Sequence, residues 1–184
     1  MLAVVVEQPH AVSVRDIPYP VAGPGDVVVK VGACGICGTD VHVIEGDFPP
    51  TVYPIVIGHE FGGEIADVGP GVTGLKVGDR VGVDPTLNCG ACYYCQRGMG
   101  NLCEAWNGIG VARTNGGFAE YVAVPARTLY PLPAGMSDAA AGLIEPVSCV
   151  VRGFHRLAPL VAETYLIFGA GPMGLLNAQV ARYN

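Results

Sequence analysis

Four cysteines within one short segment restrict the fold of this chain more than any other feature of its sequence. Residues 88–103 read NCGACYYCQRGMGNLC, which gives a C-x2-C-x2-C-x7-C spacing. Four thiolates at these intervals can close a tetrahedral shell around one Zn²⁺ ion within a single loop, with bends at Gly90 and Gly98. A closed shell leaves no coordination position for water, so its role would be structural. We therefore expect a structural zinc site, with an iron–sulfur cluster and disulfides as the alternatives. Its ligands would be Cys89, Cys92, Cys95 and Cys103.

The start of the chain and its cysteine content indicate the compartment. The sequence MLAVVVEQPH has no basic segment at its start, and its apolar run is too short for a signal peptide. No apolar run in the 184 residues approaches the roughly 18 residues of a membrane span. We expect a cytoplasmic protein, in which the seven cysteines serve as metal ligands rather than as disulfides.

The net charge restricts the partners. The chain carries 10 Lys and Arg against 16 Asp and Glu, a formal net charge of -6. Nucleic acids and anionic membranes both bind to a basic face, which this composition does not favour. We expect a small-molecule partner, and neither a nucleic acid nor a membrane.

Short apolar runs separated by glycine and proline predict a fold that is mainly β with some α. The 27 glycines and 15 prolines stand between these runs, which suits a β-barrel or sandwich with many tight turns. We expect strands at residues 2–6, 27–31, 63–68, 77–83 and 118–124. Residues 34–46 suggest the end of a strand that continues into a short helix. Ser137 is a candidate N-cap for a further helix, which Pro146 should interrupt or restart.

The end of the chain predicts the start of a second domain. Residues 164–168 are a candidate buried strand, followed by Gly169-Ala-Gly171-Pro-Met-Gly174 and an apolar helix at 175–181. In this context G-x-G-x-x-G is a dinucleotide fingerprint: Gly169 makes the turn, Gly171 lets the backbone approach the pyrophosphate, and Gly174 allows close packing. We divide the chain into residues 1–155 and the beginning of a Rossmann domain at 156–184. The residue that would distinguish NAD from NADP is expected about 20 residues further on, beyond Asn184.

A second group of potential metal ligands lies in two separate segments. Cys37 is part of GICGTDVH, and His59 is part of GHE. A thiolate and an imidazole together suit Zn²⁺. Taken alone, a buried cysteine and a packed or solvated histidine explain these residues as well, and Cys34 with Cys37 could form a redox-active C-x-x-C pair.

These segments resemble the zinc-containing medium-chain dehydrogenases. The sequence GHEFGGEIADVGPGV at 58–72 is similar to the glycine pattern that follows their His-Glu pair. The sequence ACGICGTDVH is similar to the segment that holds their catalytic cysteine, and residues 88–103 are similar to their structural zinc lobe. The resemblance implies a GroES-like β-barrel catalytic domain with a catalytic zinc held by Cys37 and His59. Either Glu60 or Glu145 would complete the ligand set. The sequence Leu-Ile-Glu145-Pro is similar to the sorbitol, polyol and threonine dehydrogenases.

The resemblance also implies a reaction. A secondary alcohol of a polyol would bind the zinc and pass hydride to NAD or NADP. Thr39 and His42 resemble a proton relay, and we expect Asp40 to orient His59. Arg152 departs from related polyol enzymes, which often have histidine there, and Cys149 is expected to be a core residue of a helix.

Two further expectations concern the protein as a whole. This chain alone should be inactive, since it carries only the beginning of a nucleotide-binding domain, and the complete enzyme should be a homo-oligomer. The alternatives are a simple alcohol dehydrogenase, a threonine dehydrogenase, and a zinc-stabilised module without catalytic activity.

Overall fold

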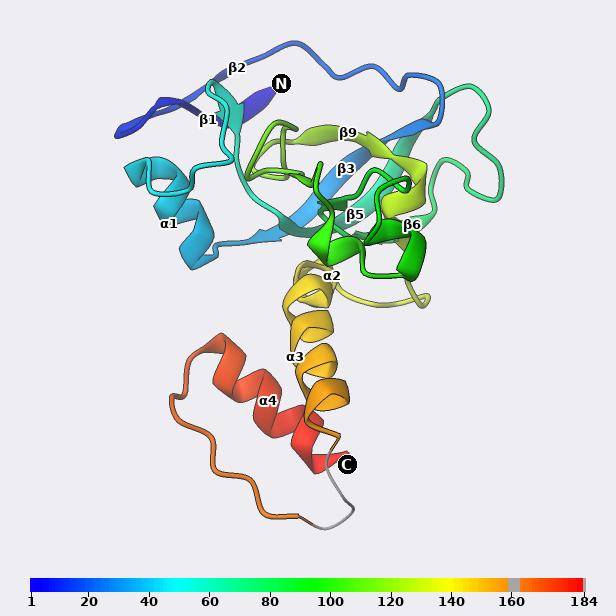
Figure 1. The fold of residues 1–184 in the computed structure, drawn as a ribbon. Helices are drawn as coiled ribbons and strands as arrows, with labels where there is room; N and C mark the ends of the chain where they lie inside the picture. The colour runs from blue at the N-terminus through cyan, green and yellow to red at the C-terminus, as the bar shows by residue number, and fades with distance from the viewer. Residues whose placement is uncertain (159–162, 184) are drawn as a thin grey trace.

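The computed structural model describes residues 1–158 and 163–183, and the fold is mainly β with some α, as predicted (Figure 1). Its largest sheet has five antiparallel strands in the order β10-β6-β5-β3-β9. These are β3 (Asp26–Gly35), β5 (Glu60–Val68), β6 (Arg80–Val83), β9 (Tyr121–Pro125) and β10 (Leu129–Pro131). A second sheet has the order β2-β1-β4, and a third consists of two short strands. These are β1 (Leu2–Gln8), β2 (Ala11–Asp16), β4 (Ile55–Val56), β7 (Thr86–Leu87) and β8 (Asn107–Gly108).

The pairing of β3 with β5 brings distant segments together. The register runs from Val27 opposite Val68 to Gly35 opposite Glu60. Alternating side chains of both strands, among them Val29 and Ile65, are fully buried in the main core. The end of β3 therefore lies beside the beginning of β5, so that the segments after Gly35 and before Glu60 are neighbours.

Helix α1 (Gly38–Glu45) follows β3 directly, as expected from residues 34–46. Its Val43 is fully buried in a second apolar cluster together with Val6, Ile55, Ile57 and Val111. This cluster fixes α1 against the edge of the β structure.

Helix α2 (Asp138–Gly142) begins at the predicted N-cap, because the hydroxyl of Ser137 accepts a hydrogen bond from the Ala140 amide at 3.2 Å. A Cβ at Gly62 of β5 would lie 2.8 Å from the Cβ of Ala141, so glycine is required for α2 to rest directly on the sheet. Pro146 lies in the first turn of the next helix, α3 (Ile144–Leu157), where the missing N–H costs nothing.

Helices α3 and α4 (Pro172–Arg182) form an arm that leaves the β structure (Figure 1). They share a small apolar cluster around Val150, Phe154 and Leu176. The helix predicted at 175–181 is therefore confirmed. Among the described residues, no helix is both long and apolar enough to span a bilayer.

The strand predicted at residues 164–168 is wrong. These five residues, all within the described part of the chain, form no strand, and Leu166 and Phe168 are 79% and 88% exposed. A strand gains its backbone hydrogen bonds from a neighbour, and none of the described strands lies alongside this segment.

Candidate metal centres

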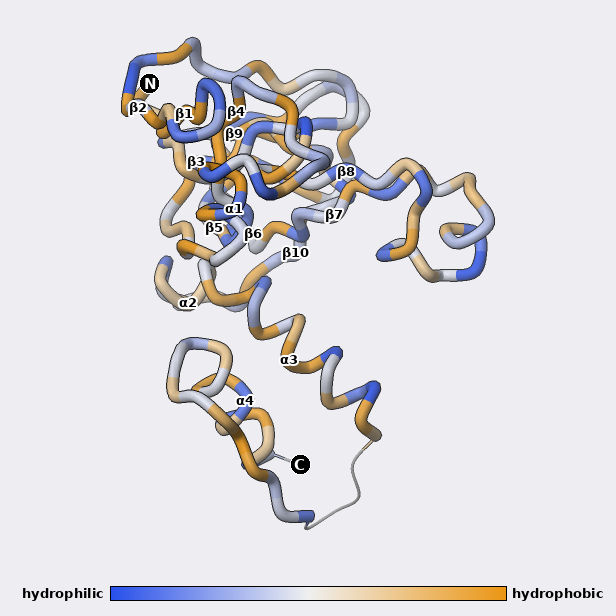
Figure 2. Tube along the Cα trace, turned by 60° about the vertical axis from the view of Figure 1, so that its left-hand side comes forward, coloured by the Kyte–Doolittle hydropathy of each residue, from blue (hydrophilic) through white to orange (hydrophobic). Residues whose placement is uncertain are grey.

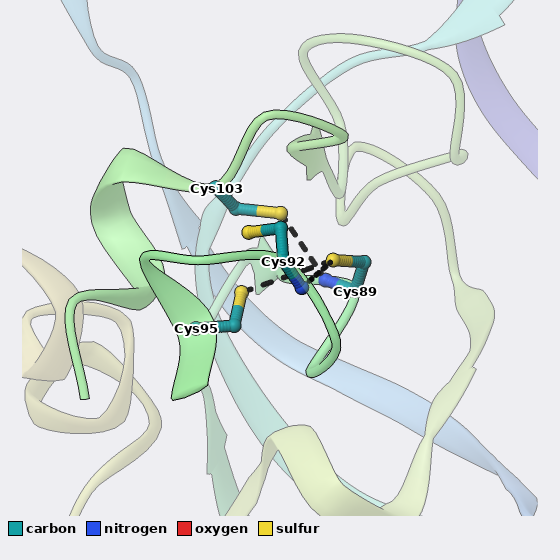
Figure 3. A group of neighbouring side chains, drawn as sticks. All are labelled: Cys89, Cys92, Cys95 and Cys103. Atoms are coloured by element: carbon teal, nitrogen blue, oxygen red, sulfur yellow. Dashed lines mark hydrogen bonds between the residues drawn. The ribbon is translucent and has the colours of Figure 1, made fainter. Parts of the chain in front are cut away.

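The cysteine lobe is the segment of residues 88–106 between β7 and β8, and it projects from the body of the molecule (Figure 2). Two short 3-10 helices, η1 (Cys95–Arg97) and η2 (Gly100–Leu102), fold it back on itself, with left-handed turns at Gly90 and Gly98 as expected. Its four cysteine side chains point toward one common centre (Figure 3), and their sulfur atoms all lie within 4.8 Å of one another. The members of this group are Cys89, Cys92, Cys95 and Cys103.

The sulfur spacing fits a single ion. A tetrahedral Zn²⁺ with Zn–S bonds of about 2.3 Å separates its sulfurs by roughly 3.8 Å. The Sγ atoms of Cys89 and Cys95 are 3.9 Å apart. A disulfide requires about 2.05 Å, and all seven cysteines are free thiols. An iron–sulfur cluster places several metal atoms between its cysteines and spreads the sulfurs further apart.

Backbone amides of the lobe stabilise negative charge on its sulfurs. The Cys89 sulfur accepts hydrogen bonds from the amides of Ala91 and Cys92 at 3.5 and 3.3 Å, and these bonds lower its pKa. The amides of Cys95 and Glu104 lower the pKa of Cys92 to about 6. Lost hydration and the neighbouring thiols raise the pKa of Cys95 to about 12, because several thiolates cannot share one site without a cation. The lobe is therefore arranged to receive a positive ion.

The second centre lies where β3 gives way to α1. Ligand atoms of Cys37, His59 and Glu60 all lie within 4.8 Å of one another. Cys37 is the N-cap of α1, Glu60 is the first residue of β5, and His59 directly precedes it. The register of β3 with β5 explains this meeting, because Gly35 is the direct partner of Glu60.

Asp40 connects the two halves of this centre. It is 1% exposed, and its Oδ2 accepts a hydrogen bond from the Cys37 amide at 2.7 Å. Its Oδ1 lies 3.3 Å from Nδ1 of His59, an ionic contact in which both atoms are buried and neither has another partner among the described residues. Asp40 thus lies beside Nδ1 of His59, as expected, which leaves Nε2 as the ring nitrogen available to a metal.

The protonation of His59 follows from its surroundings. Burial lowers its pKa, but the carboxylates of Asp40, Glu145 and Glu60 together outweigh burial and raise the pKa above its ordinary value. Three carboxylates around one imidazole favour a positive charge at this position, which either a proton or a metal ion can supply.

Glu145, the other candidate ligand, stands beside this centre rather than in the group of three. Burial raises its pKa, while the charge of His59 opposes the rise. Its Oε1 accepts a hydrogen bond from the thiol of Cys149 at 3.5 Å. Cys149 itself is exposed on α3, so its assignment to the core was wrong: its side chain lines an open cavity that it shares with Val83 of β6 and Tyr130 of β10. Glu145, Cys149 and Arg152 line a cavity of about 680 Å³. Nothing in the sequence indicated this cavity.

The two predicted relay residues lie on α1. The hydroxyl of Thr39 is 3.7 Å from the Cys37 sulfur. His42 stands one turn later and is exposed. It forms a third possible ligand group with Glu45 and Asp47, which the sequence reasoning missed, although all three side chains are exposed.

The glycine fingerprint forms a turn that leads into α4. Gly169 has a left-handed φ of 95°, and Gly171 is the N-cap of α4. A Cβ at Gly174 would collide with the Gly169 carbonyl, so glycine is needed there for the turn to close. The turn is thus present without the strand that normally precedes it.

The Asp40→Asn variant tests the link between Asp40 and His59. If the amide oxygen keeps the hydrogen bond to the Cys37 amide, the amide NH₂ faces Nδ1 and favours the tautomer with its proton on Nε2. We expect the metal affinity of this centre to fall by about 10- to 100-fold while the fold is retained. A metal titration monitored by isothermal calorimetry measures the affinity, and circular dichroism checks the fold. An unchanged affinity would remove Asp40 from the centre.

Comparisons with known proteins identify the family of the chain. A family model described as the alcohol dehydrogenase GroES-like domain matches residues 23–134. Sorbitol dehydrogenase from Halalkalibacterium halodurans is 41% identical over 92% of this chain and 49% of its own length. L-threonine 3-dehydrogenase from Streptomyces avermitilis is 44% identical over 91% of this chain and 49% of its own length.

A solved structure is similar in three dimensions. The alcohol dehydrogenase RspB from Escherichia coli CFT073, complexed with NADH, has a TM-score of 0.90 and 40% identity, over 99% of this chain and 53% of its own. The chain spans about half the length of the curated relatives it matches.

Proposed function

The chain belongs to the zinc-dependent medium-chain dehydrogenase family through its alcohol dehydrogenase GroES-like domain, and from that premise we propose that it is the metal-binding part of a polyol dehydrogenase. Such an enzyme would oxidise a secondary alcohol of a sugar alcohol and transfer hydride to NAD or NADP. One observation carries the proposal: Cys37, His59 and Glu60 meet within 4.8 Å.

The composition of each ligand group supports a division of roles. Three protein ligands of mixed type are typical of a catalytic zinc that keeps one position open, whereas four thiolates are typical of a closed structural zinc. Glu60 is the proposed third ligand because its oxygen lies in the group of three, with Glu145 as the alternative beside it. The cysteine lobe would hold the structural zinc.

The residues around the open position have separate tasks. When bound, zinc supplies Lewis acidity toward a substrate hydroxyl, and the nicotinamide accepts hydride. Asp40 holds the His59 ring in one orientation. The hydroxyl of Thr39, beside the Cys37 sulfur, would receive the substrate proton and release its own to the cofactor ribose. The exposed His42 would take the proton from the ribose and pass it to solvent, a role that suits an imidazole.

The end of the chain would serve the nucleotide. We keep residues 1–155 as the catalytic domain and 156–184 as the beginning of the Rossmann domain, with the boundary in the last turn of α3. Gly169, Gly171 and Gly174 would accommodate the pyrophosphate at the beginning of α4. A cytoplasmic location and a homo-oligomeric complete enzyme belong to the same proposal.

Cobalt substitution tests the proposed function directly. Co²⁺ replaces zinc in such sites and has visible absorption bands that depend on its ligands. We expect both centres to take up Co²⁺, and sorbitol to shift only the bands of the Cys37–His59–Glu60 centre, since only that centre has an open position. A Cys37→Ser chain should show no sorbitol-dependent shift. Metal in the lobe alone would instead support a structural module without catalysis.

The same experiment separates the alternative substrates. The L-threonine 3-dehydrogenases among the relatives favour a β-hydroxy amino acid as the second candidate. A shift with L-threonine but not with sorbitol would assign the chain to that class, and a shift with ethanol alone would indicate a simple alcohol dehydrogenase.

We expect no measurable turnover by the 184-residue chain with sorbitol and NAD. Among the described residues, no strand or sheet lies beside α4 to complete a nucleotide site, so a nicotinamide cannot be positioned for hydride transfer. The appearance of NADH absorbance measures this. The zinc-loaded chain is the required sample, and NADH formation above that of a Cys37→Ser control would contradict the expectation.

A further inference from the structure

Trp106, the only tryptophan of the chain, stands at the base of the cysteine lobe. Its amide donates a hydrogen bond to the Cys103 carbonyl at 3.2 Å, which closes a turn between the last lobe cysteine and the tryptophan. The next residue, Asn107, pairs with Leu87 where β8 and β7 close the lobe. The position of Trp106 is therefore tied on one side to a proposed zinc ligand, and Cys103 is itself buried.

The indole of Trp106 points into the apolar cluster that supports α1. It packs edge-on against Phe48, with ring centroids 6.5 Å apart and an angle of 73° between the planes. Both rings pack against the cluster that contains Val43 of α1, which is fully buried, and Val111. Through this aromatic pair the lobe thus contacts the apolar cluster in which Val43 of α1 is buried.

Hydrogen bonds join the same two segments. The Thr51 hydroxyl donates to the Val111 carbonyl at 2.7 Å, and the Val52 amide donates to the Ala112 carbonyl at 2.8 Å. The chain that follows α1 is therefore fastened to the chain that follows the lobe. At its other end, α1 begins at Cys37 and carries Asp40, which contacts His59. An eight-residue helix thus lies between the lobe and the second metal centre.

We propose that Trp106 is a positioning residue that couples metal binding in the cysteine lobe to the Cys37–His59–Glu60 centre. A metal in the lobe fixes Cys103 and the turn to Trp106, the indole fixes Phe48 and the far end of α1, and α1 sets the places of Cys37 and Asp40. The lobe then supports the second centre in addition to stabilising its own loop. The inference rests on the two metal centres of the proposed function.

A double-mutant cycle with Co²⁺ absorption as the readout tests the coupling. The affinity of the second centre is compared between the chain with a zinc-filled lobe and a Cys89→Ser/Cys92→Ser chain whose lobe cannot hold metal. We expect the filled lobe to raise this affinity by about fivefold or more. In a Trp106→Ala background the ratio should fall to one, and Trp106→Phe should restore part of it. An unchanged ratio in Trp106→Ala would overturn the proposal.

Tyr93→Ala is the matched control, because Tyr93 is an exposed aromatic residue of the lobe that packs on Tyr94 and Arg97 instead of the α1 cluster. It should leave the ratio unchanged; an equal loss would show that any aromatic deletion in the lobe suffices and would overturn the role of Trp106. Circular dichroism establishes that each variant is folded.

The reciprocal measurement needs no change in the lobe. Coupling must act equally in both directions, so abolishing the second centre with Cys37→Ser should weaken zinc binding in the lobe by the same factor, read from Trp106 fluorescence. Identical lobe affinities in the two chains would contradict the coupling. A second centre that binds no metal in the unmodified chain would refute the proposed function, whereas metal binding without coupling would refute this inference alone.

Discussion

Replacing Cys103 with serine is expected to empty the cysteine lobe of metal and to lower the free energy of unfolding by at least about 3 kcal/mol, since bound structural zinc contributes on the order of 10 kcal/mol to such sites. Cys103 is the buried member of the four and accepts a hydrogen bond from the Cys89 amide at 3.3 Å. Of the described residues 88–106, only Trp106 packs against an apolar core cluster, so the lobe has backbone hydrogen bonds but no core of its own to hold it together without a metal. Zinc content by atomic absorption and thermal unfolding measure the two effects.

Cys149→Ser is the control for this loss. Its thiol is exposed on α3 and belongs to none of the described ligand groups, and a serine hydroxyl can still donate to Glu145. We expect its zinc content and melting temperature to match the unmodified chain. If Cys103→Ser retained a full complement of zinc, the lobe would have to bind its metal through other residues.

Replacing Cys37 with serine should remove metal from the second centre alone. Serine is a good N-cap, so α1 should form as before. Loss of the thiolate should weaken metal binding by more than about a hundredfold, because removing only a hydrogen-bond partner of a metal ligand already costs up to about that factor. Cobalt spectra resolve the two centres. The lobe bands should persist and those of the second centre should vanish.

Cys34→Ser distinguishes a metal ligand from a redox partner. Cys34 lies outside the ligand group and donates weakly to the Gly35 carbonyl. Metal binding at the second centre should be lost in Cys37→Ser and kept in Cys34→Ser, whereas a C-x-x-C redox pair would need both thiols to form its disulfide. Equal loss of metal in the two variants would contradict the assignment of Cys37, without Cys34, as the ligand.

The sequence predicted those parts of the fold that depend on local pattern. The valine runs around Val29 and Val122 became strands: in β9 buried and half-buried residues alternate, as in a strand with one face on the core, whereas the consecutive valines of β3 are buried on both faces. Ser137 capped α2 as expected. Strand ends were less predictable: β6 begins at Arg80 instead of residue 77, since Gly78 adopts a left-handed φ of 88° in the preceding turn.

The parts of the fold that the sequence did not predict depend on contacts with residues far along the chain. Residues 164–168 have the composition of a strand, but composition does not supply a neighbour. Short strands such as β4 and β7 exist only because β1 and β8 pair with them. Cys149 was expected in the core of a helix, but its side chain lines an open cavity instead, which depends on how α3 packs and not on the local sequence.

The two candidate centres differ in the same way: one depends on local sequence and the other on a contact between distant segments. The cysteine lobe is a local pattern and was fully visible in the spacing of its residues. The second centre required Cys37 and His59 to meet, which follows from the register of β3 with β5 and was reached through the family resemblance. The sequence left Glu60 and Glu145 as equal candidates, and the distances favour Glu60. Nothing in the sequence pointed to the contact of Trp106 with Phe48.

The arm formed by α3 and α4 should unfold separately from the β structure. Its apolar cluster around Val150, Phe154 and Leu176 is separate from the main core, where Val27, Val29 and Ile65 are fully buried. A helix held by so few contacts opens with a smaller free energy than the strands of the main sheet. The amides of α4 should therefore exchange with solvent deuterium through local opening, while those at the centre of β3 wait for global unfolding.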